Sequence, residues 1–327
     1  MKTRLDFGDR AFAAVESKGS CVVVGLDPVW ERIPAEVRGE GQGERDEGSV
    51  LCRFCCEVVE AAAAFAAAAK PQIAFFERYG PGGLEAFAEV CRFAQAKGLL
   101  VIADVKRADI GSTSQAYADA YLGEDGLGRY IDAITVNPYL GGEALRPFFE
   151  TAKENGKGVF VLVRTSNPGA GEIQDAILSR QEAGGRVFEH VATLVKEWGG
   201  EEKGTHGYSH LGAVVGATYP EQARRVRAIL PHHWLLVPGY GAQGATALDL
   251  EGLFGENGSG VLVNASRSLI YAWERNDLGR HFAETEFRDA IQAATMKMRD
   301  EINTVRLSAG DADAGRSATG GGSDRAS

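Results

Sequence analysis

Two carboxylates and an ammonium group follow one strongly apolar segment at a spacing that suits acid–base chemistry. The run Leu99–Ala103 leads directly into Asp104, and Lys106 and Asp109 follow within the motif DVKRAD. On extended backbone, residues two apart point to the same side, so Asp104 and Lys106 are expected to project together. At the tip of a buried strand, each of these charges stabilises the other. A surface salt bridge is the alternative interpretation, and polar residues after the neighbouring apolar runs weigh against it.

A second chemical signal is the glycine-rich segment PGYGAQG, residues 238–244, which Ser266 and Arg267 follow later in the chain. Its glycines allow backbone N–H groups to approach a ligand closely, and Gln243 offers further hydrogen bonds. Arg267 can hold phosphate oxygens with its planar fork, at the start of a helix-like stretch. The segment matches neither a P-loop nor a Rossmann fingerprint, so a phosphate group is expected and a nucleoside triphosphate is not. A glycine-rich turn beside a solvated arginine is the alternative.

The elements that must position these groups are short apolar runs, each followed by a helix-like segment. Near-continuous apolar runs are typical of parallel strands that are buried on both faces. Eight β/α units predict a (β/α)8 TIM barrel of the α/β class, whose active-site groups follow the carboxyl ends of the strands. A doubly wound sheet is the structural alternative. The eight runs are Cys21–Leu26, Gln72–Phe76, Leu99–Ala103, Ala133–Val136, Gly158–Val163, Gly212–Val215, Trp234–Val237 and Gly260–Val263.

We expect a single barrel domain over residues 1–305, with two irregular segments and a tail. Residues 38–49 are polar and rich in glycine and predict a surface loop. The long stretch 167–211 is an insertion that should hold a helix near Asp175–Trp198. Residues 306–327 contain almost no large apolar side chain. Such a segment cannot bury enough surface to offset the entropy of ordering, so a disordered tail is expected.

The composition excludes several classes of protein. With 35 Lys and Arg against 45 Asp and Glu, the net charge is −10, so no general nucleic-acid-binding face is expected. No apolar run reaches the roughly 20 residues of a membrane helix, and the N-terminal segment lacks the apolar core of a signal peptide. The five cysteines predict buried thiols in a reducing cytoplasm. Neither the cysteines nor the six scattered histidines show metal-ligand spacing, so no metal is expected.

Seven segments, in order along the chain, carry a resemblance to a known family. They are VVVGLDP, KPQIAFFERYG, ADVKRADIGST, ITVNPYLG, VRTSNPG, VPGYGAQG and VNASRSLIYA, and together they extend from about residue 20 to residue 275. This combination resembles orotidine 5′-phosphate decarboxylase in its longer bacterial form. The resemblance implies a (β/α)8 barrel that works as a homodimer, without metal or organic cofactor. It also implies decarboxylation of orotidine monophosphate (OMP) to UMP and CO2 in pyrimidine synthesis.

The resemblance further implies roles for individual residues. Lys70, Asp104, Lys106 and Asp109 would form an alternating array of charges, with Lys106 as the proton donor. Asp109 and Thr113 would reach the site across the subunit interface. The remaining implied contacts are Asp27 and Lys70 for the ribose hydroxyls, Thr113 for the ribose from the partner side, Ser166 for the pyrimidine, Pro238 and Gln243 beside the base and phosphate, and Ser266 and Arg267 for the phosphate.

For two of these residues the pattern alone favours another interpretation. Lys70 precedes Pro71 at the end of an alanine-rich run, which is typical of a lysine at a helix C-terminus. Asp27 could cap the turn that follows it. The site roles of Lys70 and Asp27 therefore depend on the resemblance.

Two other functions also stay open. A related barrel decarboxylase or aldolase that acts on a sugar phosphate shares the D-x-K-x-x-D pattern and usually recruits Mg²⁺, although the motifs SNP and GYGAQG argue against it. A catalytically inactive phosphate- or nucleotide-binding barrel is the other possibility. The intact set of lysines and aspartates argues against that reading.

Overall fold

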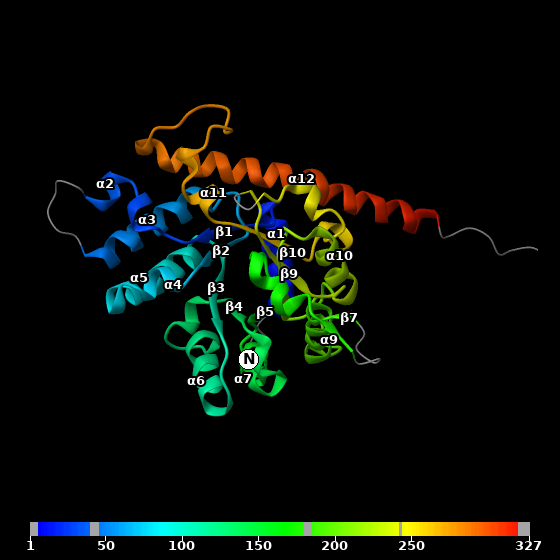
Figure 1. The fold of residues 1–327 in the computed structure, drawn as a ribbon. Helices are drawn as coiled ribbons and strands as arrows, with labels where there is room; N and C mark the ends of the chain where they lie inside the picture. The colour runs from blue at the N-terminus through cyan, green and yellow to red at the C-terminus, as the bar shows by residue number, and fades with distance from the viewer. Residues whose placement is uncertain (1–5, 40–45, 180–184, 242–243, 320–327) are drawn as a thin grey trace, which may run out of the picture.

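Eight parallel strands close into a barrel, which is the architecture that the apolar runs predict (Figure 1). The computed structural model describes residues 6–39, 46–179, 185–241 and 244–319. Around the barrel the strands follow the order β1-β10-β9-β8-β5-β4-β3-β2. Their bounds are β1 Val22–Leu26, β2 Ala68–Pro71, β3 Leu100–Arg107, β4 Ala133–Val136, β5 Gly158–Arg164, β8 Leu211–Val215, β9 Trp234–Pro238 and β10 Val261–Ala265.

Seven of the eight predicted runs overlap a barrel strand, and one prediction is wrong. The run Gln72–Phe76 was expected to be a strand, but β2 ends at Pro71 and Ala74–Glu77 forms the short helix α4. The strand consists instead of the end of the alanine-rich run and the Lys-Pro pair that follows it. Alanine has little preference for strands, so this segment is extended because the barrel requires a strand there, with all four residues buried between β1 and β3.

Helices surround the barrel, and one helix closes its amino-terminal end. The ring of Phe7 in α1 packs edge-on against Phe160 of β5, with 5.7 Å between the ring centroids. The indole N–H of Trp234 in β9 donates to the carbonyl of Gly8 at 3.2 Å. The helices are α1 Phe7–Lys18, α2 Ala35–Arg38, α3 Glu47–Ala62, α4 Ala74–Glu77, α5 Gly80–Ala96, α6 Gly111–Leu122, α7 Gly142–Glu154, α8 Gly171–Gln174, α9 Val187–Gly199, α10 Pro220–Ile229, α11 Arg267–Ile270 and α12 Phe287–Thr319.

In both irregular segments a helix begins at a different position from the one that the sequence predicts. The polar segment 38–49 is already helical from Glu47, where Asp46 caps α3 by accepting from the backbone N–H of Ser49 at 3.0 Å. Residues 40–45 of that segment lie outside the described residues. The insertion 167–211 does hold a helix, but α9 begins only at Val187, after the two-stranded antiparallel pair β6 (Ile177–Leu178) and β7 (Gly185–Arg186).

The expectation of a disordered tail from residue 306 is wrong as far as Thr319. The long helix α12, orange to red in Figure 1, crosses one side of the barrel and continues to that residue. Arg306 is almost fully buried, and its Nε donates to the carbonyl of Gly258 at 2.8 Å while its Nη2 contacts Oε1 of Glu16 at 2.6 Å. This arginine adds a polar attachment to the apolar contacts that buried side chains such as Ile302 make between the helix and the barrel. Residues 320–327 lie outside the described residues.

The cysteines behave as structural thiols. All five are free, and Cys21, Cys55 and Cys91 are buried, as predicted, whereas Cys52 and Cys56 are only partly buried. Burial raises the pKa of the Cys21 thiol to about 12, so this group stays protonated at neutral pH. Within the described part of the chain, no helix is both long and apolar enough to span a membrane.

We predict that Arg306→Ala lowers the free energy of unfolding by about 1–3 kcal/mol, because the carbonyl of Gly258 loses its buried donor. Urea unfolding at pH 7 measures the change. Arg92→Ala is the control, since Arg92 forms an exposed pair with Glu89 and its removal should cause no measurable change. Equal stability of the Arg306→Ala variant and the wild type would contradict this attachment of α12.

Candidate active site

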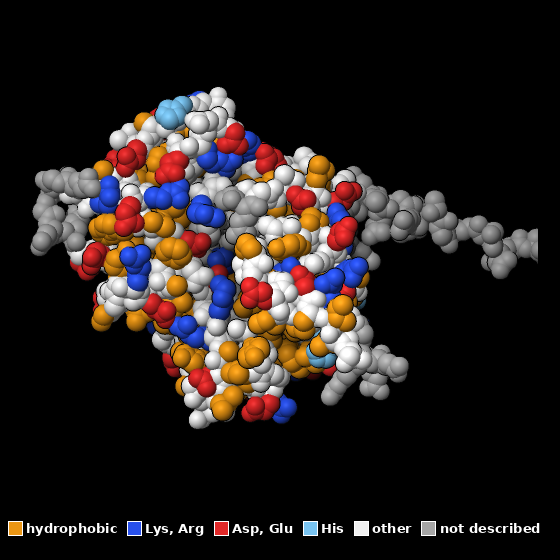
Figure 2. All heavy atoms as spheres, in the orientation of Figure 1, with side chains coloured by type: hydrophobic (Ala, Val, Ile, Leu, Met, Phe, Trp, Pro, Cys, Tyr) orange, Lys and Arg blue, Asp and Glu red, His pale blue; other side chains and the backbone are white. Residues whose placement is uncertain are grey.

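The carboxyl ends of the barrel strands surround a cavity of about 520 Å³. Lysine and arginine side chains gather near the middle of the face shown in Figure 2. Eight of the eleven residues predicted for the site line this cavity: Asp27, Lys70, Asp104, Lys106, Ser166, Pro238, Ser266 and Arg267. They come from β1, β2, β3, β5, β9 and β10 or from the segments that follow these strands. The barrel therefore brings together residues that are up to 240 positions apart in the sequence.

Asp104 is the centre of the polar contacts in the cavity. Its Oδ2 accepts from the Lys70 ammonium at 2.7 Å and from the side-chain amide of Gln72 at 2.9 Å. Its Oδ1 accepts from the Lys106 ammonium at 2.5 Å and from the Thr135 hydroxyl at 2.9 Å. Both carboxylate oxygens thus have two donors each, and two of the four donors are cations. Charge-assisted hydrogen bonds of this kind are the strong ones in proteins.

The surroundings of Asp104 keep it ionised. Burial by itself raises the pKa of the carboxyl group, but the ammonium groups of Lys70 and Lys106 outweigh this effect and hold the pKa well below its ordinary value. The pKa of Lys70 is raised: burial opposes its charge, and Asp104 and Asp27 overcome that opposition. Near neutral pH this pair is therefore a buried carboxylate bound to a buried ammonium.

Lys106 reaches Asp104 through an irregular strand and not through simple alternation. The pairing of β3 with β4 shifts register between Ala103 and Arg107, where four steps along β3 match two along β4. Within this bulge Lys106 has a φ of +44°, in the left-handed region that non-glycine residues seldom occupy. Its backbone N–H donates to the hydroxyl of Thr135 at 3.0 Å. The side chain is 46% exposed, so its ammonium group is accessible from the cavity.

Two buried oxygen atoms in the cavity wall accept no hydrogen bond within the described part of the chain. They are Oδ1 of Asp27, after β1, and Oδ1 of Asn264, in β10. The backbone N–H of Val29 donates to the Tyr271 hydroxyl and not to Asp27, and no side chain caps the turn that begins there. The capping interpretation of Asp27 is thus not what the structure shows. A ligand hydroxyl is the kind of donor that such oxygens bind.

The first residues of the glycine-rich segment after β9, Gly239 and Tyr240, line another wall of the cavity. Gly239, Gly241 and Gly244 all have positive φ values, from +70° to +105°, so each occupies backbone space that favours glycine. Pro238, Ser266 and Arg267 line the same wall. Gln243 lies outside the described residues, so its predicted contact stays a prediction.

Asp109 and Thr113 do not join the cavity in this single chain. Asp109 is half-buried in the segment after β3, where its Oδ1 accepts the backbone N–H of Ile110 at 2.8 Å. Thr113 is exposed in the first turn of α6. Ile110 and Tyr139 nearby in the loops after β3 and β4 are also exposed, at 60% and 80%. The two predicted residues therefore lie outside the cavity, on a surface that also exposes apolar side chains.

Sequence reasoning missed several residues of the cavity. Gln72, Thr135 and Asn264 each come from a strand end, and Thr135 is the one polar residue in its apolar run, which was a usable signal. Gln174 gives no such signal, because it comes from α8, well beyond the end of β5. Lys70 lies in β2, so its interpretation as a helix-terminal lysine is wrong.

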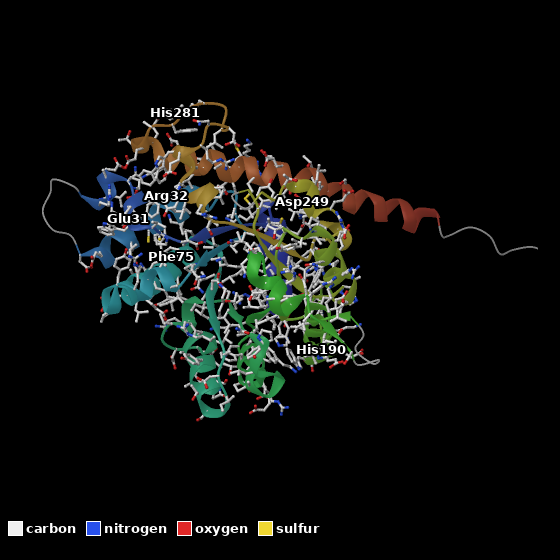
Figure 3. All side chains as sticks on the ribbon, in the orientation of Figure 1. Glu31, Arg32, Phe75, His190, Asp249 and His281 are labelled. Atoms are coloured by element: carbon white, nitrogen blue, oxygen red, sulfur yellow. The ribbon has the colours of Figure 1, made fainter. Side chains whose placement is uncertain are left out.

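The histidines lie away from the cavity. Figure 3 shows His190 on α9 and His281 before α12, on opposite sides of the molecule. His206, His232 and His281 are exposed and His190 is partly exposed, whereas His210 and His233 are buried. Burial lowers the pKa of His233 to about 3, so its ring is neutral at pH 7. Among the described residues, no group of three or more His, Cys, Asp or Glu side chains is arranged to hold a metal ion.

Comparison with known proteins identifies relatives over nearly the whole chain. Residues 20–277 match the family model described as orotidine 5′-phosphate decarboxylase / HUMPS family. Orotidine 5′-phosphate decarboxylase of Rhodopirellula baltica is 42% identical over 303 residues, which cover 91% of this chain and 99% of that protein. The enzyme of the same name from Deinococcus radiodurans is 41% identical over 288 residues, covering 88% and 93%. The solved structure of Leishmania donovani OMP decarboxylase superposes with a TM-score of 0.70 at 31% identity, covering 92% and 99%.

We predict that Asp104→Asn lowers the free energy of unfolding at pH 7 by about 3–5 kcal/mol, because Lys70 loses its buried counter-ion. The folded-state pKa of Asp104 lies below its unfolded value of 3.8, so its ion pairs stabilise the fold above about pH 4. That contribution is lost as the pH falls further. The variant should therefore lose less stability than the wild type between pH 5 and about pH 2.

Chemical denaturation at a series of pH values measures both effects. Asp277→Asn is the matched control, since Arg275 and Lys297 lower the pKa of Asp277 as well, but on the surface. Its removal should cost less than about 1 kcal/mol. Parallel stability curves for the Asp104→Asn variant and the wild type would show that Asp104 is not the acid-sensitive group.

Proposed function

The chain belongs to the orotidine 5′-phosphate decarboxylase / HUMPS family, and on this premise we propose that it decarboxylates OMP to UMP and CO2 in pyrimidine synthesis. The observation that carries the proposal is the pair of ammonium groups that Asp104 holds in the cavity. This arrangement suits a reaction in which negative charge develops on carbon. A nucleotide such as OMP also offers the hydroxyl and phosphate groups that the other walls of the cavity can bind.

The chemical difficulty of the reaction is the electron pair left on C6 of the pyrimidine. When the bond from C6 to the carboxylate carbon breaks, CO2 departs and the electron pair stays in an sp² orbital outside the ring π system. A fixed ammonium beside C6 stabilises this charge as it forms. Lys106 then transfers one proton from Nζ to C6, which gives UMP, and Lys106 regains a proton from solvent. We propose that no metal or organic cofactor takes part in this step.

Asp104 has two roles in this mechanism. It binds and orients the Lys106 ammonium group from 2.5 Å away, within the β3 bulge. A substrate carboxylate beside Asp104 also experiences like-charge repulsion, which the departure of CO2 relieves. Lys70 partly balances this repulsion, since it neutralises the other oxygen of Asp104.

The remaining lining residues bind the parts of OMP that do not react. The Asp27 oxygen that has no partner among the described residues would accept hydrogen bonds from the ribose hydroxyls, and Lys70 would donate to them. Ser166 suits the pyrimidine, and Pro238 borders the base. Ser266 and Arg267 suit the phosphate, with Gln243 beside them. Binding energy from the phosphate, far from C6, serves to organise the reacting end of the site.

We also propose that Asp109 and Thr113 complete the site of a second copy of the chain in a homodimer. Both lie outside their own cavity, and the loops beside them expose apolar side chains that a partner could cover. In this arrangement Asp109 would approach the partner's lysine array and Thr113 would approach its ribose.

We predict that purified wild-type protein consumes OMP in the presence of EDTA and that Lys106→Ala lowers kcat by at least about a thousandfold, because both the charge and the proton donor are lost. A spectrophotometric assay of OMP loss measures the rates. Lys97→Ala is the control, since Lys97 forms a surface pair with Glu60 and should leave the rate unchanged.

Other outcomes of this assay support the other functions. Activity that EDTA abolishes would favour a metal-dependent reaction on a sugar phosphate. Tight binding of UMP without any turnover would favour an inactive binding protein. Full activity of the Lys106→Ala variant would remove this lysine from the mechanism.

The interface is tested by mixing two inactive variants. Lys106→Ala and Asp109→Ala should each be inactive alone, but a mixed dimer contains one site with both residues intact. After exchange of subunits, equal amounts should recover about a quarter of the wild-type activity, since half of the dimers are mixed and have one good site of two. No recovery, with subunit exchange verified by mass spectrometry, would show that Asp109 does not act across the interface.

A further inference from the structure

Arg164, the last residue of β5, is a buried hub of contacts on the side of the cavity where Ser166 lies. Its side chain is 1% exposed. Nη1 donates to the carbonyl of Thr165 at 2.9 Å, Nη2 contacts Oδ2 of Asp175 at 3.3 Å, and Nε donates to the side-chain carbonyl of Gln222. The face of the guanidinium lies 4.1 Å from the ring centre of Tyr219. A guanidinium is costly to bury, and these partners offset the cost.

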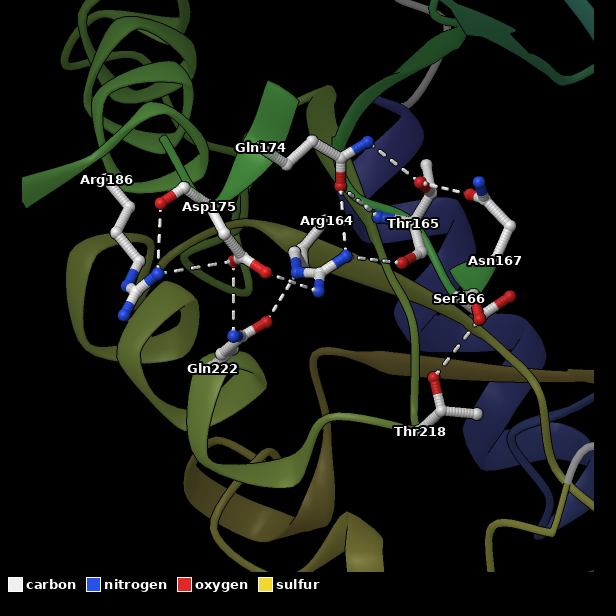
Figure 4. A network of polar contacts seen from close by, with 9 residues as sticks. All are labelled: Arg164, Thr165, Ser166, Asn167, Gln174, Asp175, Arg186, Thr218 and Gln222. Atoms are coloured by element: carbon white, nitrogen blue, oxygen red, sulfur yellow. Dashed lines mark hydrogen bonds and ion pairs between the residues drawn. The ribbon is translucent and has the colours of Figure 1, made fainter. Parts of the chain in front are cut away.

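Gln174, in α8, connects this hub to the residues that follow β5 (Figure 4). Its Oε1 accepts from the backbone N–H of Thr165 at 2.9 Å and from Nη1 of Arg164 at 3.3 Å. Its Nε2 donates to the Thr165 hydroxyl at 2.8 Å, and that hydroxyl donates to Oδ1 of Asn167 at 2.7 Å. The single amide of Gln174 therefore fixes both the backbone and the side chain of Thr165.

The residues held in this way are the ones that face the ligand. Thr165, Ser166, Asn167 and Gln174 all line the cavity. On the other side, a Cβ atom at Gly216 would lie only 2.9 Å from Cα of Ser166, so the carboxyl end of β8 and the residue after it pack directly against this segment. Ser166 is therefore enclosed between β8 and the contacts that Gln174 makes.

A second bulge explains why Arg164 can turn toward α8. The pairing of β5 with β8 shifts register between Leu162 and Arg164, so two steps along β5 match one along β8. Such bulges change the direction of the side chains that follow them. Leu162 faces the cavity, whereas Arg164 points toward α8 and α10.

We propose that Gln174 and Arg164 are positioning residues that hold Thr165–Asn167 in the conformation that receives the pyrimidine. This inference rests on the proposed function, because it assigns the base to the Ser166 side of the cavity. These contacts are made within the chain itself, so they limit the freedom that the base side of the cavity would otherwise lose when a ligand binds. The phosphate would bind at the opposite wall, near Arg267, where neither positioning residue makes a contact.

Because the base and the phosphate bind at different walls, two ligands can distinguish a local effect on the base side from a general loss of structure. Ribose 5-phosphate carries the sugar and phosphate of UMP but lacks the base. Loss of the contacts of Gln174 should therefore weaken binding of UMP and leave binding of ribose 5-phosphate unchanged. A general loss of structure would weaken the binding of both molecules.

The variant is Gln174→Leu, which keeps the size of the side chain and removes its hydrogen bonds. We expect the Kd of UMP to rise about tenfold, the effect of losing roughly one net hydrogen bond, and the Kd of ribose 5-phosphate to stay within about twofold. KM for OMP should rise in parallel with the Kd of UMP. Isothermal titration calorimetry and the decarboxylation assay measure these quantities, and thermal unfolding verifies that the variant is folded.

A pair of arginine variants supplies a matched control. Arg164→Lys keeps the charge but loses the planar fork, and it should repeat the selective loss of UMP binding. Arg227 is also buried, and it donates to the carbonyls of Leu253 at 2.7 Å and Gly260 at 2.6 Å, near the amino end of β10. Arg227→Lys should lower the unfolding temperature and leave both dissociation constants unchanged.

The possible results separate this inference from the function it rests on. Selective loss of UMP binding in the Gln174→Leu variant supports the inference. Unchanged binding of UMP, or an equal loss for both molecules, overturns it while the wild type remains an OMP decarboxylase. A wild type that neither binds UMP nor consumes OMP overturns the proposed function itself, and this inference with it.

Discussion

Asp104 is almost fully buried where the bulge in β3 begins, and its ionised state depends on two ammonium groups that belong to different parts of the chain. A carboxylate in that position is unstable without them, and Lys70 is equally unstable without Asp104. The pair therefore constrains how β2 and β3 lie beside each other at the carboxyl end of the barrel. The isolated bridge between Gln72 and Asp104 extends that pairing by one step beyond β2. The chemistry at the site thus depends on the correct pairing of β2 with β3. The ion pair between Lys70 and Asp104 in turn strengthens that pairing.

Regular strands alone would not produce this arrangement. Two of the strands that supply site residues, β3 and β5, depart from regular pairing where the site begins. In β3 the bulge places Lys106 in a left-handed conformation, which costs of the order of 1–3 kcal/mol for a side chain other than glycine. In β5 it turns Arg164 away from the barrel interior. Strain of this kind persists only where surrounding contacts determine the geometry, and here the hydroxyl of Thr135 and the carboxylate of Asp104 do so.

Sequence patterns predicted the parts of the structure that follow periodic rules. The apolar runs indicated the strands, and the polar residues after them indicated which end of the barrel is functional. Those patterns failed where tertiary context overrides local preference. Ala68–Pro71 is a strand although alanine favours helices, and Arg306 adds a buried polar attachment near the point where the apolar contacts of α12 end. Gln174 could not be predicted, because its role comes from contacts made after a bulge that leaves no mark in the sequence.

The charge of the site contrasts with the charge of the whole chain. The protein carries a net charge of −10, yet among the described residues that line the cavity three cations, Lys70, Lys106 and Arg267, face two anions, Asp27 and Asp104. Over distances beyond about 8–10 Å, salt screens the negative exterior, so an anionic ligand responds mainly to this local excess. An aspartate from a partner, such as the proposed Asp109, would cancel the excess, three against three. Stabilisation of negative charge at C6 would then depend on the positions of the charges and not on their number. Lys106 is the lysine that is both paired with Asp104 and open to the cavity. An electrostatic mechanism therefore needs the fixed bulge as much as it needs the lysine.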